Sequence, residues 1–483
     1  MNWTELKRHI KYTDSKGNNS FEVAGIDLDS RKIKPDYVFV AVRGLKSDGH
    51  DYIHKAIESG AKAIVCEEFP ESIEDGIEYL KVVDSSVSAG VASSAFYDFP
   101  SEKLKLVGIT GTNGKTTTAT LLYKLMESFG YKSGLISTVR NYIHDKSIDT
   151  SFTTPDAVRV NQLLAEMVSA GCEYAFMEVS SHAMKQNRVE GIYFTGGIFT
   201  NLTHDHLDYH LSFDDYLKSK KKFFDQLASR AFAITNVDDR NGKVMLQNTK
   251  AKVKTYGLRS MADYKCKIKA NTLQGLILDI NGVEVHSRLV GNFNAYNFTA
   301  VLAAAIELGF EINETLEKLS QIAPVDGRFD TIYNPGKKVL GIVDYAHTPD
   351  ALENVLDTIK ELKNNGRVIT VVGCGGDRDK TKRPVMAKIA ANKSDIVILT
   401  SDNPRSEDPN EILNDMVAGL EDKDHKHAYK QADRREAIRM AARLADQSGD
   451  IILVAGKGHE NYQEIKGTKF PFDDKIILKE VLI

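Results

Sequence analysis

Several features are scarce or missing in this 483-residue sequence, and each absence excludes a class of protein. The four cysteines lie far apart with no CxxC pair, which argues against a disulfide framework or a zinc site and favours reduced thiols; they are Cys66, Cys172, Cys266 and Cys374. No apolar run approaches the roughly 18 residues of a transmembrane helix. The polar start "MNWTELKRHIKYTDSKGNN" lacks the apolar core of a signal peptide. We therefore expect a cytoplasmic protein without membrane insertion.

The sequence also lacks a large excess of charge of either sign. The formal net charge is only −4, so the sequence offers no electrostatic basis for binding nucleic acid or an anionic membrane. We expect small-molecule partners and a monomer. The composition, 42% hydrophobic and 27% charged, is that of a globular protein, and the length predicts two to four domains. Repeats and low-complexity tracts are absent.

The chain divides into three segments of different character. Residues 1–100 hold short strand-like runs, at 36–42 and 61–66, separated by polar turns. From 104 onward the pattern becomes strand, glycine-rich loop and helix, with the helix stopped by Gly130. Two later runs, 173–181 and 232–239, again read as buried strands that end in polar residues. This alternation predicts a mostly parallel sheet with helices on both faces.

A third unit begins near residue 330 and contains four apolar strands whose carboxyl ends carry charged residues and glycines. They lie within 339–352, 367–380, 394–409 and 449–460. In open α/β sheets ligands bind at that edge, so the four ends together predict a binding crevice.

The stretch "VGITGTNGKTTTATLL" (107–122) predicts a phosphate site between a strand and a helix. It departs from the Walker A spacing, because Ile109 stands where the first glycine is usual. Gly111 and Gly114 still allow the backbone amides to face an anion at a helix amino terminus. Lys115 and Thr116 can then reach phosphates and a magnesium ion. A purely structural glycine turn would explain the glycines but not the Lys-Thr-Thr run.

A second polar cluster is a candidate metal site. Glu178 ends the apolar run "EYAFMEV", and "NLTHDHLDYH" (201–210) packs several histidines and aspartates together. Beside a magnesium-nucleotide loop, Glu178 and His206 become candidate ligands of a catalytic metal. An exposed carboxylate and a solvated polar loop are the alternatives.

With these motifs assembled, the chain resembles the Mur ligase family along essentially its whole length. The family loop T-G-T-N-G-K-T-T matches residues 110–117. Further motifs follow in the family's order: "MEVSSHA", "DHLDYH", "NVDD", "GNFNAYN", "GRFD", "DYAHTPDAL", "GGDRDK", "DNPR" and "GKGHE". Many ordered motifs are far more specific than any single one.

The resemblance implies an α/β protein of three domains. These are a small amino-terminal UDP-binding domain (1–100), a central P-loop ATPase-type domain with a mostly parallel sheet (101–328), and a carboxyl-terminal Rossmann-like, amino-acid-binding domain (329–483). The implied reaction belongs to peptidoglycan biosynthesis. ATP phosphorylates the D-glutamate γ-carboxyl of UDP-N-acetylmuramoyl-L-alanyl-D-glutamate, and meso-2,6-diaminopimelate attacks the acyl phosphate, releasing ADP and phosphate. L-lysine as the incoming amino acid remains an alternative.

The resemblance also implies roles for residues at the nucleotide. Lys115, Glu178, His206 and Lys220 are the implied catalytic residues. The metal Mg²⁺ would be held by Thr116, Glu178, His206 and Lys220, the last as a carbamate formed with CO₂. The implied ATP-binding residues are Gly111, Thr112, Asn113, Gly114, Lys115, Thr116, Thr117, Asn236, Arg328 and Asp344.

Two further sets are implied for the other substrates. The set for the UDP-linked dipeptide is Ser30, Thr153, Thr154, Ser180, Gln186 and Arg188. The set for diaminopimelate is Arg378, Asp402, Asn403, Pro404, Arg405, Gly456 and Glu460. A bidentate arginine suits the extra carboxylate that distinguishes diaminopimelate from lysine, and Arg405 is the candidate. A proline turn after a strand is the alternative interpretation of the "DNPR" segment.

Some positions depart from the family pattern, and three other functions compete. His204 stands where many relatives have arginine, Leu211 replaces a usual glycine, and Asp326 replaces a common proline. Folylpolyglutamate synthetase has a similar phosphate loop but lacks the UDP-binding domain and the "DNPR" and "GKGHE" pair. A nucleotide-switched binding protein has little use for an amino-acid pocket. The segment "GCGGDR" (373–378) fails the G-x-G-x-x-G spacing of a dinucleotide oxidoreductase.

Overall fold

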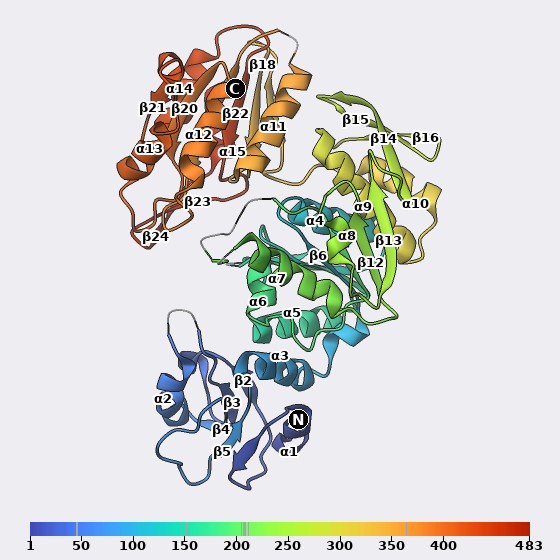
Figure 1. Cartoon of the computed structure of the whole chain (residues 1–483), viewed down its shortest axis with the longest axis vertical. Coiled ribbons are helices and arrows are strands. Elements are labelled where there is room, and N and C mark those ends of the chain that lie inside the picture. The colour runs from blue at the N-terminus through green and yellow to red at the C-terminus, as the bar shows by residue number, and fades with distance from the viewer. Residues whose placement is uncertain (45–46, 151, 204, 206–208, 211, 364) are drawn as a thin grey trace.

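The computed structural model describes the chain except residues 45–46, 151, 204, 206–208, 211 and 364. Figure 1 shows three α/β domains in chain order, with the amino-terminal domain at the bottom, the central domain in the middle and the carboxyl-terminal domain at the upper left. Each domain has its own sheet, so the predicted three-domain α/β architecture is confirmed. The boundaries after residues 100 and 328 stay a prediction.

The amino-terminal sheet has five strands in the order β1-β5-β4-β3-β2, with only β1 antiparallel. The strands are β1 (Asp14–Lys16), β2 (Gly25–Asp27), β3 (Tyr37–Val40), β4 (Ala61–Cys66) and β5 (Glu78–Lys81). One face packs against α1 (Trp3–His9) and α3 (Ser85–Phe96), and the other against α2 (Ile53–Glu58). The two strand-like runs expected in this segment are β3 and β4.

The central sheet has eleven strands in the order β16-β15-β14-β13-β12-β11-β6-β10-β7-β8-β9. Its middle is parallel, and both edges are antiparallel. The strands are β6 (Lys105–Thr110), β7 (Ser133–Ile136), β8 (Asn141–Ile143), β9 (Lys146–Ile148), β10 (Tyr174–Glu178), β11 (Gly196–Phe199), β12 (Phe232–Asn236), β13 (Lys252–Gly257), β14 (Tyr264–Thr272), β15 (Gly275–Ile280) and β16 (Val283–Ser287).

Helices cover both faces of this sheet, as its apolar parallel strands require. Two separate cores result. One lies under α4 (Lys115–Ser128), α9 (Asn292–Glu307) and α10 (Ile312–Gln321). The other lies under α5 (Ala157–Ser169), α6 (Ser181–Lys185), α7 (Phe213–Asp225) and the short α8 (Gly242–Met245). Helix α4 ends at Ser128, and Gly130 follows with a φ of 89°, so the predicted glycine stop is present.

The carboxyl-terminal sheet has six strands in the order β17-β18-β22-β19-β20-β21, with only β17 antiparallel. The strands are β17 (Asp330–Asn334), β18 (Val339–Asp344), β19 (Val368–Cys374), β20 (Ile396–Ser401), β21 (Ala428–Lys430) and β22 (Ile451–Ala455). Helices α11 (Pro349–Leu362), α12 (Lys382–Lys393) and α13 (Pro409–Val417) cover one face, and α14 (Arg434–Leu444) and α15 (Asp474–Leu482) the other. A separate hairpin pairs β23 (Tyr462–Ile465) with β24 (Thr468–Pro471).

This arrangement places the functional segments together. Strands β6 and β10 of the central sheet and strands β18, β19, β20 and β22 of the third domain direct their carboxyl ends toward one cavity. Among the described residues, no helix combines the length and apolar character needed to span a membrane.

Candidate active site

The glycine-rich loop joins β6 to α4 in a conformation that only glycine adopts without strain. Gly111 has a φ of 149° and Gly114 a φ of 87°. A Cβ atom on Gly111 would lie 1.9 Å from the Thr200 hydroxyl oxygen, and one on Gly114 would lie 2.5 Å from Oδ1 of Asn297. Both glycines are therefore required by close packing as well as by backbone geometry. Because α4 begins directly after Gly114, its free amino-terminal N–H groups meet the loop, as an anion site requires.

Two lysines converge on this loop. Nζ of Lys115 donates hydrogen bonds to the carbonyls of Gly111 (3.0 Å) and Thr112 (2.8 Å). Nζ of Lys220, from α7, donates to the same Gly111 carbonyl at 2.7 Å. Burial lowers the pKa of Lys115, and burial together with the neighbouring Lys115 charge moves the pKa of Lys220 well below its usual value. Burial and the Lys115 charge therefore both favour the neutral form of the Lys220 amine.

Glu178 ends β10 fully buried and is held by a neighbouring loop. The Thr138 backbone N–H donates to its Oε1 (2.8 Å), and the Thr138 hydroxyl donates to its Oε2 (3.2 Å). On the other side of the loop, Nη2 of Arg328 donates to the Thr116 hydroxyl at 3.1 Å. Carboxylate and hydroxyl oxygens are ligands of the kind that Mg²⁺ prefers, so Glu178 and Thr116 fit that ion. His206, the other expected ligand, lies outside the described residues.

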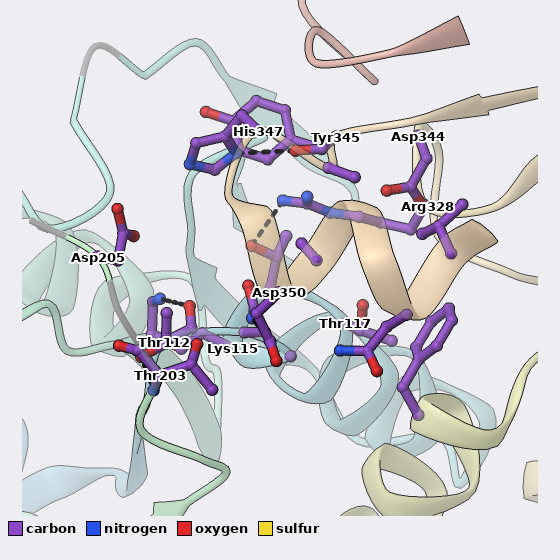
Figure 2. Close-up of a pocket in the computed structure, with 18 of the residues that line it drawn as sticks. Thr112, Lys115, Thr117, Thr203, Asp205, Arg328, Asp344, Tyr345, His347 and Asp350 are labelled. Atoms are coloured by element: carbon purple, nitrogen blue, oxygen red, sulfur yellow. Dashed lines mark hydrogen bonds between the residues drawn. The ribbon is translucent and has the colours of Figure 1, made fainter. Parts of the chain in front are cut away.

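A cavity of about 640 Å³ opens between the central and carboxyl-terminal domains. It is lined by the loop Thr112–Thr117, by Glu178, and by residues of the third domain (Figure 2). From the expected ATP set it also contains Asn236, Arg328 and Asp344. From the expected diaminopimelate set it contains Arg378, Asp402, Asn403, Arg405, Gly456 and Glu460. One cavity therefore joins the glycine-rich loop to residues of the third domain that lie more than two hundred positions later in the chain.

A cluster of aromatic rings lies around Tyr345 in the cavity wall. The Arg328 guanidinium lies 4.3 Å from the centre of the Tyr345 ring, and Figure 2 shows it running beneath that ring. The Tyr345 ring also lies 4.5 Å from the His347 ring and 5.1 Å from the His459 ring. Burial lowers the pKa of His347 to about 4 and that of His459 to about 3, so both rings are neutral at pH 7.

The part of the cavity around Asn403 and Glu460 rests on a buried lysine, Lys457, that the sequence-based interpretation missed. Nζ of Lys457 donates to Oδ1 of Asn403 (2.9 Å) and to Oε2 of Glu460 (2.8 Å). The Asn403 amide donates to the same Glu460 oxygen at 2.8 Å. Burial by itself would raise the pKa of Asp402, but the nearby Lys457 and Arg434 charges lower it. The Asp402 carboxylate, whose charged form these cations favour, suits an ammonium group.

The residues expected to bind the UDP-linked substrate lie in three places: a hydrogen-bonded network, the cavity wall and the amino-terminal domain. The Thr154 hydroxyl donates to the Glu178 carbonyl (2.7 Å), and Nη1 of Arg188 donates to the Thr154 carbonyl (2.7 Å). Ser180 and Gln186 join this network, through the Ser180 N–H to the Thr154 hydroxyl (3.2 Å) and Arg188 to the Gln186 side chain (2.6 Å). Thr153 reaches the cavity itself. Ser30 lies apart, buried in the amino-terminal domain.

Comparison with known proteins matches all three parts of the chain to one family. Residues 22–98 match the model "Mur ligase family, catalytic domain", residues 109–305 match "Mur ligase middle domain", and residues 327–458 match "Mur ligase, glutamate ligase domain". A relative from Phocaeicola vulgatus named UDP-N-acetylmuramoyl-L-alanyl-D-glutamate–2,6-diaminopimelate ligase is 56% identical over 100% of this chain and 99% of its own. The chain belongs to the Mur ligase family.

Two further similarities agree with this assignment. A protein of the same name from Bacteroides fragilis is 54% identical, again over 100% of this chain and 99% of its own length. A solved structure of a protein with that name is 33% identical and has a TM-score of 0.66, covering 95% of this chain and 94% of that one. The resemblance to Mur ligases read from the sequence motifs is confirmed.

Some expected Mur ligase residues lie outside the cavity wall, and some wall residues were not expected. Three of the expected residues do not line the cavity: Gly111, Pro404 and Lys220. Lys220 nevertheless donates a hydrogen bond to the Gly111 carbonyl of the glycine-rich loop. The Asn236 amide lines the cavity but donates to the Thr200 carbonyl at 2.9 Å.

Two residues that the sequence analysis did not single out, Thr138 and Asp350, also line the cavity. Asp350 stands inside the "DYAHTPDAL" motif, which carried its signal, whereas a lone threonine in a loop carries none.

Proposed function

We propose that this protein is an ATP-dependent ligase of peptidoglycan biosynthesis. It joins meso-2,6-diaminopimelate to the D-glutamate γ-carboxyl of UDP-N-acetylmuramoyl-L-alanyl-D-glutamate. The observation that carries this proposal is that one cavity is lined both by the glycine-rich loop and by the polar side chains of Arg405 and Glu460. A ligase must bring a phosphoryl donor and an amino acid to one carboxyl group, whereas a nucleotide switch has no need for the second group. The names of the full-length relatives support the choice of substrates.

The first step is phosphorylation of the substrate carboxylate. A carboxylate oxygen attacks the γ-phosphorus of ATP, the bond to the β-phosphate oxygen breaks, and ADP leaves. Lys115 and the amino-terminal N–H groups of α4 stabilise the negative charge on the transferring phosphoryl group. Thr116 and Glu178 would hold Mg²⁺, which would neutralise part of the phosphate charge. The Thr138 contacts keep the Glu178 carboxylate in place.

The second step is attack by the incoming amine. The neutral amine adds to the carbonyl carbon of the acyl phosphate, and inorganic phosphate leaves as the amide forms. Asp402 and Glu460 orient the amino acid by accepting hydrogen bonds from an ammonium group, and Arg405 binds the distal carboxylate. L-lysine lacks that carboxylate and would leave Arg405 without its partner, so we rank it as the second candidate.

We further propose that Lys220 is carbamylated and that His206 contributes to the metal site. CO₂ reacts with the neutral form of an amine, and the lowered pKa of Lys220 makes that form more accessible. Carbamylation would give Lys220 an oxygen-bearing anionic group, so its interaction with the Lys115 charge would become attractive. Thr153, Thr154, Ser180, Gln186, Arg188 and Ser30 would bind the UDP-linked dipeptide. Asn236, Arg328 and Asp344 would surround the nucleotide.

The deciding experiment measures phosphate release by the purified protein with ATP, the UDP-linked dipeptide and a panel of diamino acids. Release only when all three substrates are present, with meso-diaminopimelate preferred over L-lysine, supports the proposal. Release without any amino acid would indicate a nucleotide switch. A preference for L-lysine would retain the reaction class but refute the assigned amino acid.

A further inference from the structure

The hairpin β23–β24 is bonded to the "DNPR" loop along the backbone. Arg405 N–H donates to the Glu464 carbonyl (3.0 Å), and Lys466 N–H donates to the Arg405 carbonyl (2.6 Å). The Glu464 N–H donates to Oδ1 of Asn403 at 2.9 Å. Arg405 itself has a φ of 51°, a left-handed conformation that costs free energy in a residue other than glycine. The hairpin therefore maintains a strained backbone at the residue proposed to bind the distal carboxylate.

The Arg405 side chain is held from two sides. Nη1 donates a 2.7 Å hydrogen bond to the Gly376 carbonyl, and Nε lies 3.6 Å from Oε2 of Glu464. A Cβ atom on Gly375 would lie 2.8 Å from Nη1, so the missing side chain of this glycine leaves space for the guanidinium. Of these contacts with described residues, the hydrogen bond to Gly376 uses Nη1 and the ion pair with Glu464 uses Nε, so neither uses Nη2. The guanidinium thus keeps an edge free for a ligand while two fixed partners set its direction.

We propose that Glu464 is a positioning residue that orients the Arg405 guanidinium toward the distal carboxylate of the incoming amino acid. This inference rests on the proposed function, since it concerns the amino-acid end of the same cavity. Glu464 does not line that cavity, and its side chain is 27% exposed. It acts on the substrate only through Arg405.

The physical reason lies in the length of the arginine side chain. A guanidinium binds a carboxylate through two parallel hydrogen bonds, which require one orientation of the planar group. Without an acceptor beside Nε, the side chain would sample other rotamers, and substrate binding would have to immobilise it. That immobilisation costs binding free energy, because a long side chain loses rotamer freedom. Only recognition of the distal carboxylate should be affected, because the Glu464 side chain contacts Arg405 and does not line the cavity.

The test compares Glu464→Ala and Glu464→Gln with the unmodified protein by steady-state phosphate release. For Glu464→Ala we expect the KM for meso-diaminopimelate to rise about three- to ten-fold, while kcat and the KM for ATP change less than about two-fold. Glu464→Gln keeps a polar oxygen beside Nε but removes the charge of the ion pair, so the KM for meso-diaminopimelate should rise less than in Glu464→Ala. Arg405→Ala sets the upper limit, with turnover reduced by orders of magnitude and ATP binding retained.

Glu480→Ala is the matched control. Glu480 forms an ion pair of the same length, 3.6 Å, with Arg435 in the same domain but on α15. This variant should leave every KM unchanged. An unchanged or lowered KM for diaminopimelate in Glu464→Ala would overturn the inference, as would equal changes in both KM values. If the unmodified protein does not use diaminopimelate at all, the proposed function fails first, so the two failures are distinguishable.

Discussion

Asn113 and Asp350 lie 237 positions apart in the chain, and the Asn113 amide donates a 2.7 Å hydrogen bond to the Asp350 carboxylate. Asn113 belongs to the phosphate-type loop, and Asp350 lies in the first turn of α11 in the third domain. Burial raises the pKa of Asp350, and the bond from Asn113 opposes that shift. The contact therefore links the nucleotide loop of one domain to a helix of another.

We expect Asp350→Ala to weaken this link and to raise the KM for ATP about three- to ten-fold. The loop itself should remain folded, because the Asn113 N–H also donates to Oδ1 of Asn201 at 2.9 Å. A change of this size corresponds to one ordinary hydrogen bond, about 0.5–1.5 kcal/mol. Steady-state kinetics measure it. Glu353→Ala is the control, since Glu353 lies on the same helix and pairs instead with Lys393 at 3.1 Å. Equal ATP constants in both variants would show that the contact plays no part in nucleotide binding.

Lys115→Ala should abolish most of the activity, with kcat falling by about 100-fold or more because a cation aimed at the phosphoryl group is lost. Lys115 also bonds to two loop carbonyls, so a melting temperature is needed to show that the fold survives. Lys124→Ala offers a comparison on the same helix, where the lysine contacts carbonyls of Ala323 and Pro324 instead. Undiminished product formation by Lys115→Ala would refute the proposed chemistry.

The carbamate proposed on Lys220 is testable without an activity measurement. Intact-protein mass spectrometry under native conditions should show the mass of one added CO₂ when bicarbonate is present, and this addition should disappear in Lys220→Ala. Lys221, the next residue, is paired with Asp225 at 2.6 Å, so Lys221→Ala should retain the added mass. An identical mass with and without bicarbonate would refute the modification. Lys115 and Lys220 would then share the Gly111 carbonyl as two unmodified lysines.

Asp344 provides a prediction about stability and pH. Burial raises the pKa of its carboxyl group from 3.8 to about 6, although the Phe329 N–H donates to it at 2.7 Å. Between these two values the folded protein holds a proton that the unfolded chain has lost. The stability contributed by this group is therefore complete below about pH 4 and is lost as the pH rises through 6.

Asp344→Asn keeps the side chain neutral at every pH while its amide oxygen can still accept from Phe329. We expect the variant to unfold at a higher Tm than the unmodified protein at pH 8, by an amount equivalent to at most about 3 kcal/mol. The difference should shrink at pH 5. Thermal unfolding at the two pH values measures it, and a difference that grows as the pH falls would contradict the assigned pKa. Activity should fall in the same variant, since Asp344 lines the nucleotide cavity.

Much of the cavity was predictable because its residues stand at strand ends. Glu178 ends β10 and Asp344 ends β18, each where an apolar run gives way to polar residues. Parallel strands bring such ends to one edge, so the sequence pattern alone indicates where ligands bind. The phosphate-type loop was equally visible, because its glycines and its lysine are needed by local geometry. Local requirements of this kind leave a readable pattern.

The contacts between distant segments were not predictable in the same way. Nothing at Thr138 indicates that it holds both oxygens of Glu178. Lys457 sits inside a recognised motif, but its role in joining Asn403 to Glu460 depends on how a loop folds over the sheet. Glu464 lies on a hairpin without any motif of its own. Each of these contacts depends on tertiary packing, in which one partner does not constrain the sequence near the other.

The amino-acid sequence by itself determined the order of strands and helices, the three α/β segments, the glycine loop and the family, because these follow from local periodicity, backbone conformation and ordered motifs. Tertiary structure alone decided which cations share a carbonyl, which threonine orients the buried glutamate and which hairpin supports Arg405. The reason is physical: hydrogen bonds and ion pairs between segments far apart in the chain form only when the sheets and helices have packed, and burial then sets the charge state of the groups involved.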